Sequence, residues 1–116
     1  MSVNIYDAAN ELERTIRKSD EYTRLMQAFK AVNEEEEAKK MFEGFREIQM
    51  KLQQKQMMGQ DVSPEEMEEA QKTIALVQQN QKITELMEAE QRMSVVLADI
   101  NQVIMKPLEE LYGANN

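Results

Sequence analysis

The sequence predicts an all-α protein, and its composition, its periodicity and one central turn support this prediction. The 116 residues include only three glycines and two prolines, and 5% of them are aromatic. The abundant residue types, such as glutamate, glutamine, lysine, leucine and methionine, favour helices. No segment shows the alternation of apolar and polar residues that is typical of a half-buried strand. The length suits one domain, so we expect a single helical domain over residues 1–116.

The central turn lies at residues 59–66 and predicts the tip of a helical hairpin. Gly59 can supply the left-handed conformation that ends a helix. Ser63 can then cap the next helix, with Pro64 at its first position and Glu66 completing a capping box. We therefore place the tip at residues 59–63, between the two long antiparallel helices of the hairpin.

Two shorter helices are expected before the hairpin. Asn4 can cap the first of them, and Ser19, followed by two acids, predicts a break before the second. The alternative is one bent helix. Asn33 precedes four consecutive glutamates, which predicts the start of the incoming hairpin helix at this point. The four acids could also form a cation site or an acidic recognition patch.

The two hairpin helices carry matching apolar stripes. Steps of three and four residues, typical of a coiled coil, connect Ala38, Met41, Phe45, Ile48 and Leu52, and they connect Met67, Ala70, Ile74 and Val77. The matching predicts that the two helices pack together. After Leu52 the first stripe fails, because Lys55 takes the next apolar position. Gly44 lies within this helix, where glycine is less favourable than alanine. It could allow a neighbouring helix to approach closely, or it could be an exposed position without a structural role.

The last third of the chain predicts a broadly apolar helix. Asn80 can cap it, and its apolar residues cover roughly 200° of the helical wheel, so it should contact elements on two sides. Lys106 and Pro107 are expected to end or kink this helix, leaving a short C-terminal turn that stops at Gly113. The predicted fold therefore has about five helices plus this turn.

The residue types that are missing exclude much chemistry. The chain has no cysteine, which removes disulfides, thiolate metal sites and thiol nucleophiles, and no histidine, which removes the usual general base. Glutamate pairs occur at positions 43 and 47, 65 and 69, and 85 and 88, but they fit solvated helix faces. No EF-hand loop or glycine-rich phosphate loop is present. We expect no catalytic residue, no cofactor and no metal.

Charge and hydropathy limit the partners. The net charge is −8, with 11 acids and 10 bases in the first 60 residues but 11 acids and 4 bases in the rest. The acidic half disfavours direct binding of nucleic acid. The N-terminus resembles no signal peptide, and no apolar run approaches the ~20 residues of a membrane span. We expect a soluble cytoplasmic protein that does not bind membranes.

Four residues form the candidate surface for a partner or a second copy: Met57, Met58, Leu76 and Val95. Methionines at a hairpin tip can form an adaptable binding surface, although a tip with little to pack against would have the same composition. Leu76 and Val95 lie outside the main apolar stripes of their helices. They suggest an apolar surface that the rest of the chain does not cover. A homodimer would bury it, because two-fold dimers are the commonest soluble assemblies.

Several segments resemble the YheA/YmcA/YlbF-like family of small bacterial helical proteins. They are residues 6–12, 19–22, 41–46, 52–57, 86–94 and 104–113. The resemblance implies an oligomeric helical protein in the cytoplasm of a Gram-positive bacterium. The YmcA and YlbF branches are regulators of competence, sporulation and biofilm formation, and they act in a complex linked to an RNA-decay endonuclease. That complex carries iron–sulfur clusters held by cysteines, and a chain without cysteine cannot hold one in this way. The family brings no site residues.

Two functions remain open at this stage. The first is a self-associating protein–protein interaction module or regulatory adaptor, which the apolar stripes and the missing catalytic residues favour. The alternative is a holdase-like or structural scaffold protein that binds apolar segments of other chains. Ten methionines and an acidic second half are compatible with the alternative.

Overall fold

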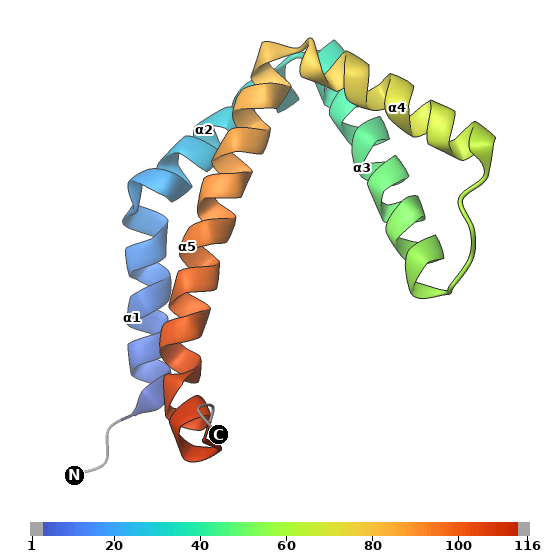
Figure 1. Cartoon of the computed structure of the whole chain (residues 1–116). Helices are drawn as coiled ribbons and strands as arrows, with labels where there is room; N and C mark the ends of the chain where they lie inside the picture. The colour runs from blue at the N-terminus through green and yellow to red at the C-terminus, as the bar shows by residue number, and fades with distance from the viewer. Residues whose placement is uncertain (1–3, 114–116) are drawn as a thin grey trace. The chain divides into compact units, whose positions relative to one another are not determined.

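Five α-helices account for almost all of the structure, a computed structural model that describes residues 4–113 (Figure 1). They are α1 (Ile5–Lys18), α2 (Asp20–Glu34), α3 (Glu36–Met57), α4 (Pro64–Gln78) and α5 (Gln81–Leu111). No strand occurs in the described range. The prediction of an all-α fold with about five helices is confirmed.

The helices form two compact units. The hairpin unit comprises Met26–Met87, and the terminal unit comprises the described residues before and after it. Both α2 and α5 pass from one unit into the other. The single domain expected over residues 1–116 stays a prediction.

The hairpin unit is built on α3 and α4, which run in opposite directions on either side of the turn (Figure 1). Four residues of the predicted stripes are buried, namely Ala38, Phe45, Ala70 and Val77, and so is Phe42. Three further side chains of this unit are fully buried: Val32, Ile83 and Leu86. Burial of one large aliphatic side chain contributes about 1.5–3 kcal/mol, so this core holds the hairpin together.

The predicted starts and stops around the hairpin are confirmed. The Ser63 hydroxyl accepts a hydrogen bond from the Glu66 backbone N–H at 3.1 Å, and the Glu66 carboxylate accepts one from the Ser63 backbone N–H at 3.0 Å. Gly59 adopts a left-handed φ of 70°. The Asn80 side chain accepts from the Ile83 backbone N–H at 3.2 Å. Local signals therefore determine where the chain turns.

The same holds near the N-terminus, where Asn4 caps α1 by accepting from the Tyr6 backbone N–H at 2.9 Å. Ser19 is extended, with φ −70° and ψ 153°, and separates α1 from α2. The two-helix prediction is therefore right, and the alternative of one bent helix is wrong.

The predicted helix start at Asn33 is wrong. Helix α2 continues through this residue to Glu34, and the Asn33 side chain donates to the Phe29 carbonyl at 2.9 Å instead of capping α3. The break falls at Glu35, whose backbone is extended. The Glu35 carboxylate also forms an ion pair with Lys82 at 2.8 Å, a contact that joins the start of α3 to the start of α5. The burial of Val32 near the end of α2 outweighs the local capping signal.

Lys106 and Pro107 were expected to end or kink the last helix, and the predicted end is wrong, whereas a kink stays a prediction. Helix α5 continues through Pro107 to Leu111, so no separate C-terminal turn exists before the left-handed Gly113. Proline removes only one helical hydrogen bond, to the carbonyl four residues earlier. Val103, which holds that carbonyl, is exposed, so water can satisfy the freed oxygen.

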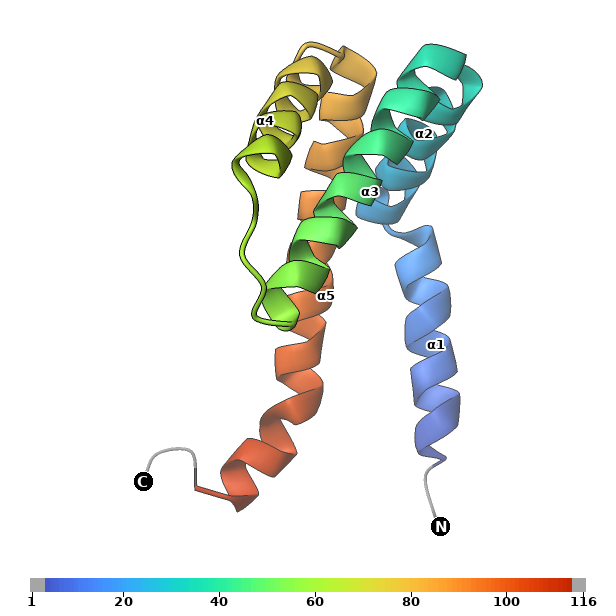
Figure 2. The ribbon, with the colours of Figure 1, turned by 90° about the vertical axis from the view of Figure 1, so that its right-hand side faces the viewer.

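The terminal unit has a small core. Ala89 and Met93 of α5 are buried, whereas α1 has no buried residue. In Figure 2, α1 and the C-terminal part of α5 diverge toward the two ends of the chain. Residues 101–111 of α5 and the adjoining Tyr112 are all exposed. This unit therefore leaves much of its apolar surface uncovered.

Candidate functional site

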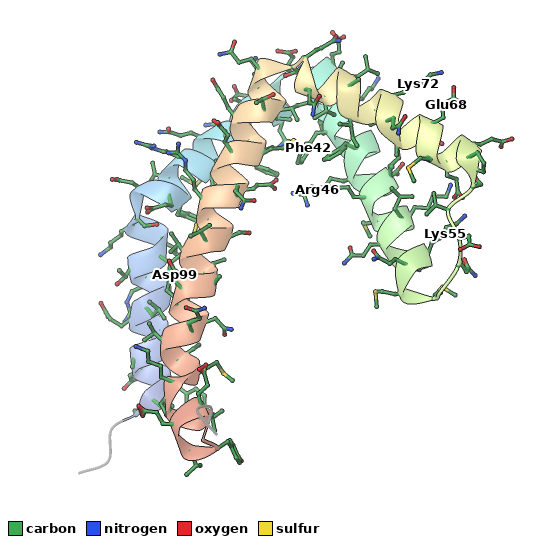
Figure 3. All side chains as sticks on the ribbon, viewed as in Figure 1. Phe42, Arg46, Lys55, Glu68, Lys72 and Asp99 are labelled. Carbon is green, nitrogen blue, oxygen red and sulfur yellow. The ribbon has the colours of Figure 1, made fainter. Side chains whose placement is uncertain are left out.

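The hairpin tip is held by an ion pair between Lys55 of α3 and Glu66 of α4. The Lys55 ammonium donates a hydrogen bond to the same carboxylate oxygen that accepts from the Ser63 backbone N–H. The hydrogen bond from Lys55 and those from Ser63 lower the pKa of Glu66 to about 2. Figure 3 shows Lys55 near the tip. The tip is therefore fixed by charge where the apolar stripe of α3 stops.

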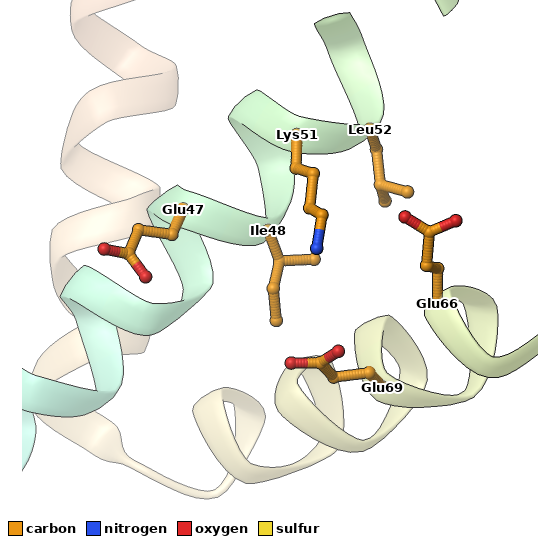
Figure 4. A pocket seen from close by; sticks show the side chains of 6 residues that line it. All are labelled: Glu47, Ile48, Lys51, Leu52, Glu66 and Glu69. Carbon is orange, nitrogen blue, oxygen red and sulfur yellow. The ribbon is translucent and has the colours of Figure 1, made fainter. Parts of the chain in front are cut away.

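Next to this ion pair lies a small open pocket between α3 and α4, of about 110 Å³. Its lining consists of Glu47, Ile48, Lys51 and Leu52 from α3 and of Glu66 and Glu69 from α4 (Figure 4). Two bases and three acids thus lie along one edge of the hairpin when Lys55 is included. Of the three carboxylates in the lining, that of Glu66 is engaged in hydrogen bonds with Lys55 and Ser63.

Metal binding finds no support in the described part of the chain. No group of three or more acidic side chains lies close enough together there to hold a metal ion. The glutamate pairs of the sequence, such as Glu65 with Glu69, therefore have no third acidic side chain close enough to complete a metal site in this part of the chain. The Glu68 carboxylate lies 4.0 Å from Lys72, and both side chains are mostly exposed (Figure 3). Exposed pairs of this kind contribute little to stability.

The terminal unit has a wider hollow of about 400 Å³ between the start of α2 and the middle of α5. Its lining residues are Asp20, Glu21 and Arg24 from α2 and Gln91, Arg92, Val95 and Val96 from α5. Two acids and two arginines balance each other in charge, and the two valines are the apolar part of the lining. Such a mixed, open surface suits contact with a protein better than it suits the enclosure of a small substrate.

All four residues of the predicted partner surface are at least half exposed: Met57, Met58, Leu76 and Val95. Met57 and Met58 adjoin each other at the end of α3, and Leu76 lies on α4 in the same unit. Val95 belongs to the terminal unit, where it lines the hollow. Their role in binding stays a prediction.

Sequence reasoning missed a larger set of exposed apolar side chains on the C-terminal part of α5: Val103, Ile104, Met105, Leu108 and Leu111. They were overlooked because a helix end was expected at Pro107. That end divided one continuous apolar stripe into two short pieces. The signal that could have found them is the spacing itself, which continues across Pro107 at helical steps.

The fold and these surfaces define a small all-helical protein with charged and apolar side chains exposed on its helices. The family model described as control of competence regulator ComK, YlbF/YmcA, matches residues 5–109. The chain therefore belongs to the YlbF/YmcA family, as its resemblance to that family predicted.

Relatives and solved structures agree with this assignment. The UPF0342 protein YheA of Bacillus subtilis is 57% identical over 114 residues, which cover 98% of this chain and 97% of that protein. A Bacillus stearothermophilus protein of unknown function (DUF964) has a similar structure, with a TM-score of 0.83 and 43% identity, covering 97% of this chain and 98% of that chain.

The fold also occurs in a crystal structure of Bacillus subtilis RicA in complex with RicF. The TM-score is 0.68 at 21% identity, and the match covers 97% of this chain and 99% of that chain. At this identity the comparison shows a shared fold. In the described part of the chain, no helix combines the length and the hydrophobicity that crossing a membrane requires.

Proposed function

We propose that this protein is a non-catalytic regulatory adaptor of the cytoplasm, which self-associates and binds other proteins through apolar side chains on its helices. The observation that carries the proposal is the large number of exposed apolar side chains on regular, well-formed helices. Contiguous exposed apolar surface on a folded protein marks interaction sites. Neither cysteine nor histidine is available for catalysis.

Two comparisons support a regulatory role. The family is described as one that controls a competence regulator, and the RicA structure contains a second protein, RicF. An adaptor needs a surface for a partner and no chemistry of its own. The mixed hollow beside Val95 and the methionines at the hairpin tip offer such surfaces.

Sedimentation velocity over a concentration series tests self-association. A dimer at tens of micromolar is the expected result, and a monomer over the whole series would contradict this half of the proposal. The measurement needs no partner, so it separates self-association from the binding of other proteins.

Affinity capture from bacterial cytoplasm tests the binding of other proteins. The Met57→Ser/Met58→Ser double variant should lose partners that the wild-type chain retains, because it removes the apolar part of the tip without changing its charge. A Lys72→Ser variant serves as a control, since its side chain is exposed on α4. Partners that bind the wild type and both variants equally would remove the tip from the proposal.

A further inference from the structure

The three most exposed methionines in the described part of the chain lie near the end of α3. Their exposed fractions are 69% at Met50, 81% at Met57 and 66% at Met58. By contrast, Met41 of the same helix is half-buried, and Met93 of α5 is only 6% exposed. We call Met50, Met57 and Met58 the tip methionines.

The tip methionines lie away from the apolar stripe of α3. Met50 is about 180° from Met41 on the helical wheel, and Met57 is about 140° from Leu52. The segment around them is polar, with four glutamines and two lysines among residues 49–56. Packing within the hairpin therefore does not require an apolar side chain at these positions.

The contacts that hold the tip do not use the methionine side chains. Lys55, Ser63 and Glu66 form the ion pair and the capping box. Met58 contributes its backbone N–H, which donates to the Gln54 carbonyl at 3.1 Å. A chemical change at the methionine sulfur atoms therefore leaves these contacts in place.

The sulfur chemistry of the chain is confined to methionine. Cysteine thiolates are the usual targets of peroxides in proteins. This chain has no cysteine and ten methionines. The sulfur atoms that solvent reaches most freely are thus those of the tip methionines.

We infer that the tip methionines are a site of reversible oxidation by hydrogen peroxide. The sulfur lone pair attacks one peroxide oxygen, and the S–O bond forms as the O–O bond breaks. The hydroxide that leaves takes the proton of the transferred hydroxyl group and becomes water. The thioether is thereby oxidised by two electrons to a sulfoxide, and the peroxide is reduced by the same two electrons.

Oxidation changes the surface of the tip and not its fold. A sulfoxide is polar and accepts hydrogen bonds, so each converted side chain becomes similar in polarity to the neighbouring glutamines. The tip then loses the apolar side chains that a partner would contact. Oxidation would release such a partner, and this consequence rests on the proposed function of the tip in binding other proteins.

Peptide mass spectrometry after graded exposure to hydrogen peroxide measures the oxidation rate at each methionine. Each tip methionine should react at least about fivefold faster than Met93, because solvent reaches its sulfur. The urea-unfolded chain is the control, since all its methionines should react at similar rates. Equal rates at the tip methionines and at Met93 in the folded protein would overturn the inference.

Glutamine variants test whether the change spares the fold. The Met50→Gln/Met57→Gln/Met58→Gln variant imitates the polarity of three sulfoxides and should keep the helical content and the urea midpoint of the wild type. Met93→Gln is the matched control and should lower the midpoint, because it buries an amide. A similar loss of stability in both variants would overturn the separation of the tip methionines from the fold.

Reduction of the oxidised protein tests reversibility. Methionine sulfoxide reductases of both stereospecificities, supplied with dithiothreitol, should return the tip sulfoxides to thioethers. The sulfoxide oxygen leaves as water, and the dithiol becomes a disulfide. Tip sulfoxides that persist in the folded protein but are reduced in the urea-unfolded chain would overturn reversibility.

Affinity capture with oxidised bait tests the release of a partner. Wild-type bait that has been treated with peroxide and then freed of it should lose the partners that the Met57→Ser/Met58→Ser variant also loses. The Met50→Leu/Met57→Leu/Met58→Leu bait should keep them after the same treatment, because leucine preserves the apolar surface and carries no sulfur. Equal loss from both treated baits would overturn the tip methionines as the cause of release.

The outcomes separate this inference from the proposed function. If the serine variant loses no partner, the tip is not a binding surface, and the rate measurement alone decides whether it is an oxidation site. If the serine variant loses partners but oxidised wild-type bait keeps them, the proposed function stands and the release by oxidation is overturned.

Discussion

Lys55 and Glu66 form an ion pair across the hairpin at the position where the apolar stripe of α3 ends. Both side chains are mostly buried, at 26% and 17% exposure, and Glu66 also closes the capping box of α4. One carboxylate therefore fixes the start of α4 and the end of α3 together. The polar residue that interrupts the stripe is thus a structural contact and not a gap in the packing.

This arrangement predicts a specific pH dependence of stability. The pKa of Glu66 is lowered from 4.5 to about 2, so the unfolded chain takes up the proton first as the pH falls. The contribution of Glu66 should be complete above about pH 4.5 and disappear as the pH falls toward 2. Urea unfolding near neutral pH and at a pH between these two pKa values should show that Glu66→Gln destabilises the protein more at the higher pH.

Glu68→Gln is the matched control for that experiment. Glu68 lies on the same helix, but its side chain and that of its partner Lys72 are about three-quarters exposed. Its removal should change the free energy of unfolding little at either pH. An equal pH dependence for both variants would contradict the role assigned to Glu66.

Ser63→Ala should destabilise the protein by about 1 kcal/mol, because it removes the hydroxyl that accepts from the Glu66 backbone N–H. The urea midpoint measures this change. The Ser63→Ala/Glu66→Gln double variant should lose less than the sum of the two single changes, since both residues belong to one hydrogen-bonded unit. Strict additivity would indicate that the two halves of the capping box act separately.

Two glycine substitutions should have opposite effects. Gly44 lies within α3, and a Cβ atom added there would have no neighbour within 4 Å, so Gly44→Ala should stabilise the helix by about 0.5–1 kcal/mol. Gly59 has a φ of 70°, so Gly59→Ala should destabilise by about 1–2 kcal/mol, although space is available there too. Thermal unfolding of both variants at equal concentration measures the difference.

Leu86 and Leu76 offer a test of where the core lies. Leu86 is fully buried, so Leu86→Ala should reduce the free energy of unfolding by about 2–5 kcal/mol. Leu76 is half exposed in the same unit, and Leu76→Ala should change it by less than about 0.5 kcal/mol. Similar losses in urea unfolding would show that the hairpin unit packs differently from the structure described.

Signals confined to a few residues were predictable from the sequence. Gly59 ends a helix, and Ser63 and Asn80 each cap the start of one, as predicted. Each of these roles depends only on residues within four positions in the sequence. The pattern at Asn33 predicted the wrong start, because the burial of Val32 and the contact of Glu35 with Lys82 both depend on residues far apart in the sequence. No local pattern reveals such a contact.

The candidate site was less predictable for a related reason. Exposure at Val103 and Ile104 depends on which other elements pack against α5, and periodicity alone does not determine that packing. Gly44 is a second example, because the sequence did not distinguish a close approach of a neighbouring helix from an exposed position. The structure shows no neighbouring atom within 4 Å of a Cβ added there. The family assignment was accessible because helix-face patterns extend over nearly the whole chain.

The Lys55–Glu66 ion pair also favours one register of α3 against α4. An apolar stripe with a seven-residue repeat would match its partner again after a slide of one heptad, about 10.5 Å along the axis. Such a slide would separate Lys55 from Glu66 and leave two mostly buried charges without their partners. The charged pair near the end of α3 thus selects one alignment from several that the apolar residues would accept.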